Sequence, residues 1–244
     1  MTAMLEISKV TKKFGGLVAL KDVSLTIKNN ELWGLIGPNG AGKTTLFNCI
    51  SGVYKPDSGI IKLKGIEITG MRPYKICHLG LGRTHQIVRP FLNLSGIRNV
   101  MVGVLYGKKD KKLGVKEAEK EAERYLEFVG LQDKMHEIVR NYTLADMRML
   151  EIARALATNP KLLLIDECLS GLTPAETIKA VEIIRKIRDE FGITIIWIEH
   201  VMRALMKVVE KVVVLHHGEK IAEGSPYEVS SDKKVIQAYL GEKV

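Results

Sequence analysis

Residues 37–44 read Gly37-Pro38-Asn39-Gly40-Ala41-Gly42-Lys43-Thr44, and this stretch decides the fold. It matches the pattern G-x-x-x-x-G-K-[ST] in full. The apolar residues 32–36 before it predict a buried strand, and Leu46 and Ile50 after it have helical spacing. Glycines let backbone N–H groups turn toward phosphate oxygens, and the positive end of the following helix favours negative charge. The strand, loop and helix therefore predict a phosphate-binding loop.

Side chains at the end of this loop extend the prediction to a nucleoside triphosphate and its metal ion. Lys43 can neutralise the β and γ phosphates, and the hydroxyl of Thr44 is a hard oxygen ligand suited to Mg²⁺. Thr45 is a further candidate for phosphate contact. The residues expected to bind the nucleotide here are Gly37, Asn39, Gly40, Ala41, Gly42, Lys43, Thr44 and Thr45.

An acidic pair follows a second apolar run, residues 162–165. At the carboxyl end of a buried strand, Asp166 can reach the Mg²⁺ shell through water. Glu167 would point differently, and if it faces a water in line with the γ phosphate its carboxylate can act as a general base. Alone, such a pair can be a mere strand terminus. Together with the phosphate loop, it predicts a site for hydrolysis.

The remaining patterns predict how the chain is organised. Alternating apolar residues over 5–10 and 23–27 predict strands on either side of a turn at Gly15-Gly16. Residues 116–129 place an apolar stripe on a helix. From residue 146 onward helices and strands alternate, which implies a parallel sheet with right-handed crossovers.

This order predicts an α/β fold of the P-loop NTPase (RecA-like) class, with a mostly parallel sheet core, an antiparallel β subdomain and an inserted helical subdomain. We expect one domain over residues 1–244, with a core lobe of residues 1–94 and 146–244 and a helical lobe at about residues 95–145. A capping box at Thr173-Pro174-Ala175-Glu176 predicts a helix that runs to Gly192. The residues expected on its inward face are Ile178, Val181, Ile184 and Ile187.

Composition narrows the class of protein. The 244 residues are 46% hydrophobic and 27% charged, which excludes a disordered or fibrous chain. No window has the roughly 18 apolar residues of a membrane span, and the N-terminus lacks an export signal, so we expect a cytosolic protein. Three separated cysteines without a CxxC pair argue against zinc and disulfides. The net charge is +9, and its dense run, Lys108, Lys109, Lys111 and Lys112, is interpreted as a solvated loop, with a lipid or nucleic-acid patch as the alternative.

These motifs, in this order, resemble the ATP-binding subunits of ABC transporters over essentially the whole chain. The similarity is greatest to the ATPases of branched-chain amino acid importers. The segments that carry it are KFGG at residues 13–16, GRTHQIVRPF at 82–91, LEIARAL at 150–156, IAEGSP at 221–226 and AYLG at 238–241. The resemblance implies bound ATP and Mg²⁺.

The resemblance also implies roles for single residues. Phe14 would stack on adenine, with Val18 in the same nucleotide site. Gln86 would link Mg²⁺ to the permease, and His200 would act at the γ phosphate beside Lys43 and Glu167. Each has a plain alternative, since Phe14 can be a core residue, Gln86 a surface amide and His200 the start of a turn. His216-His217 matches no metal-ligand spacing and is interpreted as structural.

The sequence departs from the family at its signature segment. LSGGQ or LSYGQ is usual there, whereas this chain has Tyr142-Thr143-Leu144-Ala145-Asp146. In the family this segment reaches the nucleotide held by the opposite subunit of a head-to-tail dimer. Ala145 adds a Cβ and Asp146 a negative charge, and both oppose phosphate binding. Thr143 and Asp146 also have capping-box spacing, so the helix can satisfy its own N–H groups.

The resemblance implies a second ATPase chain, integral membrane permease subunits and a place at the inner face of the membrane, with no nucleic acid. Two alternatives stay open. One is a soluble ABC-type ATPase that acts on nucleic acid or ribosomes, although this chain has neither a long coiled-coil insertion nor two cassettes. The other is a regulatory subunit that hydrolyses ATP weakly because of its altered signature.

Overall fold

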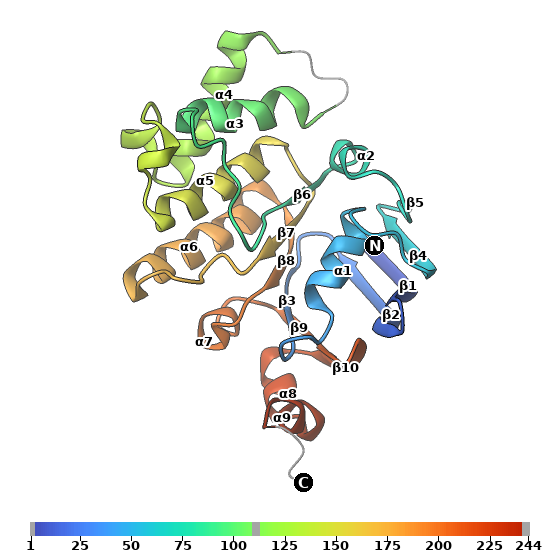
Figure 1. Cartoon of the computed structure of the whole chain (residues 1–244). Helices are drawn as coiled ribbons and strands as arrows, with labels where there is room; N and C mark the ends of the chain where they lie inside the picture. The colour runs from blue at the N-terminus through green and yellow to red at the C-terminus, as the bar shows by residue number, and fades with distance from the viewer. Residues whose placement is uncertain (1–2, 109–112, 241–244) are drawn as a thin grey trace.

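The computed structural model describes residues 3–108 and 113–240, and it contains two β-sheets with helices around them (Figure 1). Helices α3 and α4 lie at one end of the molecule and α8 and α9 at the other, with the sheets between them (Figure 1). Lys109, Lys111 and Lys112 of the basic run, and Gly241 of the matching tail, lie outside the described residues.

The first sheet is antiparallel and has the strand order β2-β1-β4-β5. Its long hairpin turns at Gly15, whose φ of 57° is easily adopted only without a side chain. The predicted antiparallel subdomain is therefore confirmed. Its strands are β1 (Ala3–Phe14), β2 (Leu17–Lys28), β4 (Ser58–Leu63) and β5 (Ile66–Glu67).

The second sheet has the order β10-β9-β3-β8-β7-β6, and four of its five neighbouring pairs are parallel. Only β10 at the edge is antiparallel, to β9. The expected mostly parallel core is thus confirmed. Its strands are β3 (Leu32–Ile36), β6 (Leu81–Arg83), β7 (Leu162–Asp166), β8 (Thr194–Ile198), β9 (Lys211–His216) and β10 (Glu219–Gly224).

Both faces of the second sheet are buried, which is why its strands are continuous apolar runs. Leu162 and Leu164 pack into the cluster that contains the first sheet and helix α1 (Lys43–Ile50). Leu163 and Ile165 point to the other face and join the cluster of the helical part. The central strands therefore lie fixed between two layers, and side chains at their ends are held in defined positions.

Three helices form most of the helical part: α3 (Gly96–Tyr106), α4 (Val115–Phe128) and α5 (Leu144–Ala157). The predicted stripe on α4 is confirmed, because Ala118, Ala122 and Leu126 are fully buried. Short 3₁₀ turns at Gln132–Lys134 and Val139–Asn141 lead into α5. Helix α5 contributes to the same buried cluster as the central sheet, so it connects the two parts; the division into lobes at residues 95 and 145 stays a prediction.

Helix α6 (Pro174–Phe191) begins with the predicted capping box and ends at Gly192 in the left-handed conformation. One expected inward residue is wrong, since Ile178 is 61% exposed. Residues three apart in a helix are rotated by about 300°, which is about 60° short of a full turn. Over the three such steps from Ile178 to Ile187 the shortfall adds up to about 180°, so Ile178 lies on the face opposite to Ile187. The buried residues of this helix are Ala180, Ile184 and Ile187.

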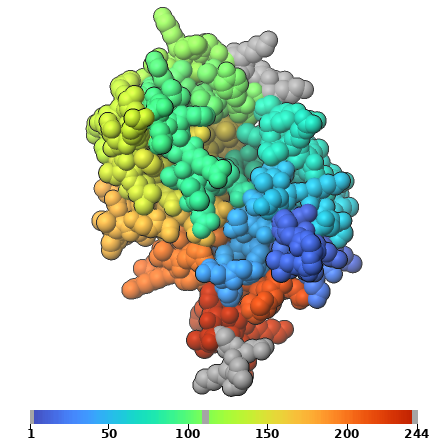
Figure 2. Space-filling model, viewed as in Figure 1, coloured from blue at the N-terminus to red at the C-terminus, as the bar shows by residue number. Residues whose placement is uncertain are grey.

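Four short helices complete the fold: α2 (Pro73–His78), α7 (Met202–Leu205), α8 (Pro226–Ser231) and α9 (Lys233–Leu240). The surface is hollowed between α2 and α3 (Figure 2). Among the described residues, no helix has the length and apolar character that crossing a membrane requires.

Two isoleucines on α6 give a matched test of this packing. Ile184 is 0% exposed, and Ile184→Ala should lower the free energy of unfolding by about 2–5 kcal/mol because it leaves a cavity. Ile178→Ala on the exposed face should change it by less than about 0.5 kcal/mol. Urea denaturation of both variants measures the difference, and equal losses would contradict the described orientation of α6.

Candidate active site

The glycine-rich loop runs from the end of β3 to the start of α1. Gly37 has φ +147°, and a Cβ there would overlap the carbonyl oxygen of Leu215. Gly42 has φ +102°, and a Cβ there would lie 2.6 Å from the carbonyl oxygen of Ala19. The loop can take this path only because both positions lack a side chain.

Lys43, the first residue of α1, is buried against its own loop. Its Nζ donates to the carbonyl oxygens of Gly37 at 2.6 Å and Pro38 at 3.0 Å. Burial lowers the pKa of Lys43, and the carboxylates of Glu167 and Asp166 oppose that shift. A phosphate oxygen is a charged acceptor and competes well with neutral carbonyls for this ammonium group.

Asp166 ends β7 and is 1% exposed. Its Oδ2 accepts from Arg83 Nη2 at 3.3 Å, and its backbone N–H donates to the hydroxyl of Thr84 at 3.0 Å. Its Oδ1 is buried without a hydrogen-bond partner among the residues that the structure describes. Burial raises the pKa of Asp166, and the charge of Arg83 opposes this. An unpartnered carboxylate oxygen beside the phosphate loop fits a hydrated Mg²⁺, for which it is a preferred ligand.

Glu167 brings three separate segments together. Its φ is 49°, and its backbone N–H donates to the carbonyl oxygen of Ile198 at 2.9 Å. Gln86 Nε2 donates to its Oε2 at 2.9 Å. His200 Nε2 lies 2.8 Å from its Oε1. The carboxylate is therefore oriented on both oxygens.

A cleft of about 470 Å³ lies over the phosphate loop and Glu167. It brings together most of the predicted site residues, with Asp166 buried beneath as the neighbour of Glu167. Phe14 is 42% exposed at this cleft, and its ring packs edge-on against Tyr54 at 5.1 Å between centroids, so it is not a core residue. The lining residues are Phe14, Leu17, Val18, Ala19, Asn39, Gly40, Ala41, Gly42, Lys43, Thr44, Thr45, Gln86, Glu167, His200 and His217.

Comparisons with known proteins agree with this geometry. The model of the family described as ABC transporter matches residues 20–170, and the model described as Branched-chain amino acid ATP-binding cassette transporter matches residues 219–244. The chain is 37% identical over 250 residues to the high-affinity branched-chain amino acid transport ATP-binding protein BraF of Pseudomonas aeruginosa, with 98% of each chain covered. This chain belongs to the ABC transporter family.

Solved structures of ABC cassettes have the same fold. The ADP conformation of MJ1267, an ATP-binding cassette of an ABC transporter, superposes with a TM-score of 0.89 at 30% identity, over 99% of this chain and 100% of that one. The dimeric cassette MJ0796 bound to ADP and Pi gives 0.83 at 26% identity, over 91% and 99%. The predicted P-loop NTPase fold is therefore confirmed.

The segment predicted to be the signature lies at the start of α5 and does not line the cleft over the phosphate loop. The predicted capping box is present: Thr143 Oγ1 accepts from the backbone N–H of Asp146 at 3.2 Å, and Asp146 Oδ2 accepts from that of Thr143 at 3.0 Å. Lys134 Nζ lies 2.6 Å from the same carboxylate. These hydrogen bonds and the lysine outweigh burial and lower the pKa of Asp146, so the carboxylate is charged at neutral pH.

Sequence reasoning missed two buried residues of the site. Arg83 joins Asp166 to the end of α1, where its Nη1 donates to Asn48 Oδ1 and Ser51 Oγ, both at 2.7 Å. Glu199 accepts from the backbone N–H groups of Leu169 at 3.1 Å and His200 at 2.9 Å. The one available signal for Glu199 was a charged residue between a buried strand and His200. His217, interpreted as structural, lies on the cleft wall.

Arg83 offers a test of the charge pairing in this cassette. Its side chain is 9% exposed beside Asp166, so Arg83→Ala leaves a buried carboxylate without its counterion and should lower the free energy of unfolding by about 3 kcal/mol. Arg185→Ala removes an arginine that is 66% exposed beside Asp189 and should cost less than about 1 kcal/mol. Denaturant titrations compare the two, and similar costs would count against the buried pair.

Proposed function

We propose that this chain is the ATP-hydrolysing subunit of an ABC importer for branched-chain amino acids. The observation that carries the proposal is the carboxylate of Glu167, which Gln86 and His200 orient at the edge of the cleft over the phosphate loop. The names of BraF and of the family that matches residues 219–244 support the class of transported substrate. The relatives described above are transport proteins, which gives the nucleic-acid and purely regulatory alternatives no support.

In the proposed mechanism, ATP lies with its phosphates on residues 37–45 and its adenine beside Phe14 and Val18. Lys43 leaves the carbonyl oxygens of its loop for the β and γ phosphates. Glu167, which Gln86 and His200 orient, accepts a proton from the attacking water as the water oxygen bonds to the γ phosphorus, while the bond to the bridging oxygen breaks and ADP leaves. His200 contacts Glu167 and lines the same cleft, where it would act at the γ phosphate.

Mg²⁺ fits this site through oxygen ligands of this chain. Thr44 supplies a hydroxyl, and Asp166 supplies a buried oxygen that has no protein partner among the described residues. Gln86 donates through its amide nitrogen to Glu167, which leaves its amide oxygen for the metal. A bound Mg²⁺ would neutralise charge on the phosphates.

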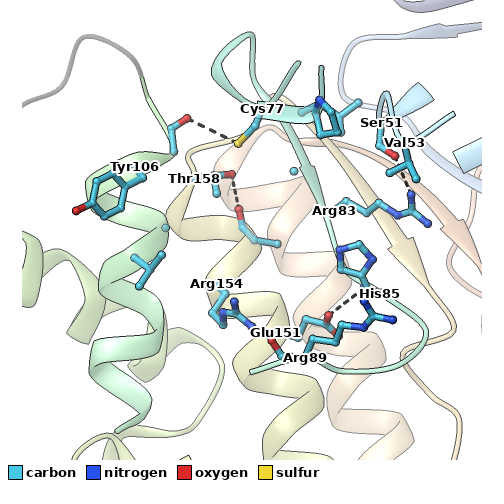
Figure 3. Close-up of a pocket in the computed structure, with 17 residues that line it drawn as sticks. Ser51, Val53, Cys77, Arg83, His85, Arg89, Tyr106, Glu151, Arg154 and Thr158 are labelled. Atoms are coloured by element: carbon cyan, nitrogen blue, oxygen red, sulfur yellow. Dashed lines mark hydrogen bonds between the residues drawn. The ribbon is translucent and has the colours of Figure 1, made fainter. Parts of the chain in front are cut away.

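A second groove, whose lining includes His85 and Arg89, is suited to binding an integral membrane permease. It holds about 520 Å³ between α2, α3 and α5, and its wall includes Val53 and Tyr106, which are both exposed (Figure 3). Phe91 is 46% exposed, and its ring centre lies 5.1 Å from the guanidinium of Arg154, a residue that lines this groove, so the segment from Gln86 to Leu94 offers an apolar group beside the groove. A permease helix seated there would hold the chain at the cytoplasmic face of the membrane.

We further propose that the chain pairs head to tail with a second ATPase chain and gives it a weak signature. The charged Asp146 would approach the γ phosphate bound by the partner, and Thr143 is already engaged by Asp146. Because the dimer has two composite sites, a partner with an ordinary signature keeps the site on this chain's own phosphate loop active.

Replacing the general base tests the proposed reaction. Glu167→Gln keeps the shape of the side chain and removes its basicity, so ATP should bind within about threefold of the wild-type affinity while turnover falls at least about a hundredfold. The control is Glu190→Gln, at an exposed position near the end of α6. Equilibrium binding of ATP and phosphate release measure the two effects. Turnover equal to that of the control would refute the role of Glu167.

Restoring an ordinary signature tests the weak composite site. Thr143→Ser, Leu144→Tyr, Ala145→Gly and Asp146→Gln made together remove the carboxylate and the Cβ that oppose phosphate. ATP hydrolysis by the chain as a homodimer should then rise several-fold, by about 1 kcal/mol of transition-state stabilisation or more. Asp189→Asn, at a half-exposed carboxylate on α6, is the control. An unchanged rate would mean that the altered signature is not limiting.

A further inference from the structure

Residues 84–94 carry Gln86 and contain neither helix nor strand. Their backbone N–H and C=O groups therefore need partners from other elements. Thr84 has one in the central sheet, where its N–H donates to the carbonyl oxygen of Leu164 at 2.9 Å. The partners of the residues after Thr84 come from the helical part.

Helix α5 supplies three of these partners from one face. Glu151 Oε1 accepts from the backbone N–H of His85 at 3.0 Å. Arg148 Nη1 donates to the carbonyl oxygen of Gln86 at 2.7 Å, and Arg154 Nη1 donates to that of Arg89 at 2.9 Å. Their spacing of three residues makes them neighbours along the helix. Figure 3 shows Glu151 and Arg154 beside His85 and Arg89, with the bond between His85 and Glu151 drawn.

Arg148 and Glu151 are buried, unlike the residues of an ordinary surface contact. Each of the two residues is only 7% exposed. Buried groups that lose a partner keep the full cost of desolvation, so the bonds to the backbone of residues 85 and 86 are strongly favoured. They flank the peptide that joins His85 to Gln86, and the Gln86 side chain leaves this peptide toward Glu167.

We propose that Arg148 and Glu151 are positioning residues, which hold the backbone of residues 85 and 86 where the Gln86 side chain reaches the carboxylate of Glu167. Neither residue lines the nucleotide cleft, so neither is expected to touch ATP. The inference rests on the proposed function, because it assigns Gln86 a part in hydrolysis. Arg154 holds the segment three residues further on and has a smaller effect on Gln86.

The charges around Glu151 give this proposal a pH dependence. Burial raises the pKa of Glu151 to about 7, and the neighbouring Arg148 and Arg154 oppose the shift while Asp166 adds to it. Arg83 on β6 also faces this carboxyl group, and the His85 ring, whose pKa burial lowers, stays neutral at pH 7. The hydrogen bonds of Arg148 and Glu151 to the backbone of residues 85 and 86 form a clamp. Protonation of Glu151 weakens its acceptance of the His85 N–H, so the hydrogen bonds of this clamp are stronger above pH 7 than below it.

The effect of rising pH on the stability of the protein is opposite in sign to its effect on the hydrogen bond between Glu151 and His85. Glu151 has its pKa raised from the ordinary 4.5, so the free energy of unfolding falls as pH rises from about 4.5 to about 7. Glu151→Gln removes this loss, because an amide has no charge to bury. A variant that loses turnover at pH 8 without losing stability therefore separates positioning from packing.

The test uses the full-length chain together with the membrane subunits that co-purify with it, and measures kcat and KM for MgATP. Glu151→Gln and Arg148→Ala should lower kcat about tenfold and leave KM within about twofold, since the phosphate loop is unchanged. Arg148→Lys keeps a donor and should recover part of the loss. Glu190→Gln and Arg185→Ala are the matched controls, exposed on α6.

Four results decide the proposal. It is supported if the ratio of wild-type kcat to that of Glu151→Gln rises from about pH 6 to about pH 8 while the variant stays at least as stable as the wild type. It is overturned if both variants match the controls, or if kcat falls only together with stability and ATP binding. If the wild-type assembly hydrolyses no ATP, the proposed function is wrong, and the positioning role that rests on it is wrong as well.

Discussion

The parallel pairing of β3, β8 and β7 is the constraint on which the site depends. In its register Leu35 lies beside Ile198, and Ile198 lies beside Asp166, so the three strands end together. The phosphate loop, Glu167 and His200 begin one or two residues beyond these ends. Because functional groups of open parallel sheets gather at the carboxyl edge, residues more than a hundred positions apart meet at one carboxylate. Two apolar layers hold the strands in that register.

This edge of the sheet buries an unusual number of charges. Each of these charged side chains is about a tenth exposed or less and has a hydrogen-bond partner, which for Lys43 is its own loop and for the others is another segment; the residues are Lys43, Arg83, Asp166, Glu167 and Glu199. Burial alone would favour their neutral forms, and it does raise the pKa of Asp166 and Glu199. Such charges are retained where function requires them, since packed apolar residues would stabilise the fold at least as well.

The sequence was sufficient where a local pattern determines a local structure. The phosphate loop, the two capping boxes and the buried parallel strands all follow from neighbouring residues, and so does the self-capped signature helix. It was insufficient where a contact joins distant segments. Arg83 and Glu199 show no local pattern that distinguishes them from strand termini. The prediction that Ile178 faces inward was wrong because residues three apart in a helix rotate progressively around its axis. The clamp of Arg148 and Glu151 on residues 85 and 86 depends on how α5 packs, which spacing alone does not give.

The irregular path of residues 84–94 follows from the two bodies that it joins. A helix would satisfy most of its own backbone groups and a strand would pair with its neighbours in the sheet, so neither would need partners from α5. The backbone of this segment instead forms hydrogen bonds to both parts. Its first residue donates to Leu164 in the sheet, and later residues bond to Glu151, Arg148 and Asn99 in the helical part. The position of the Gln86 side chain is therefore set by how the helical part lies against the sheet. Helix α5 starts at the predicted signature segment, lines the groove of Figure 3 and donates to the backbone of Gln86, so one helix contacts all three places.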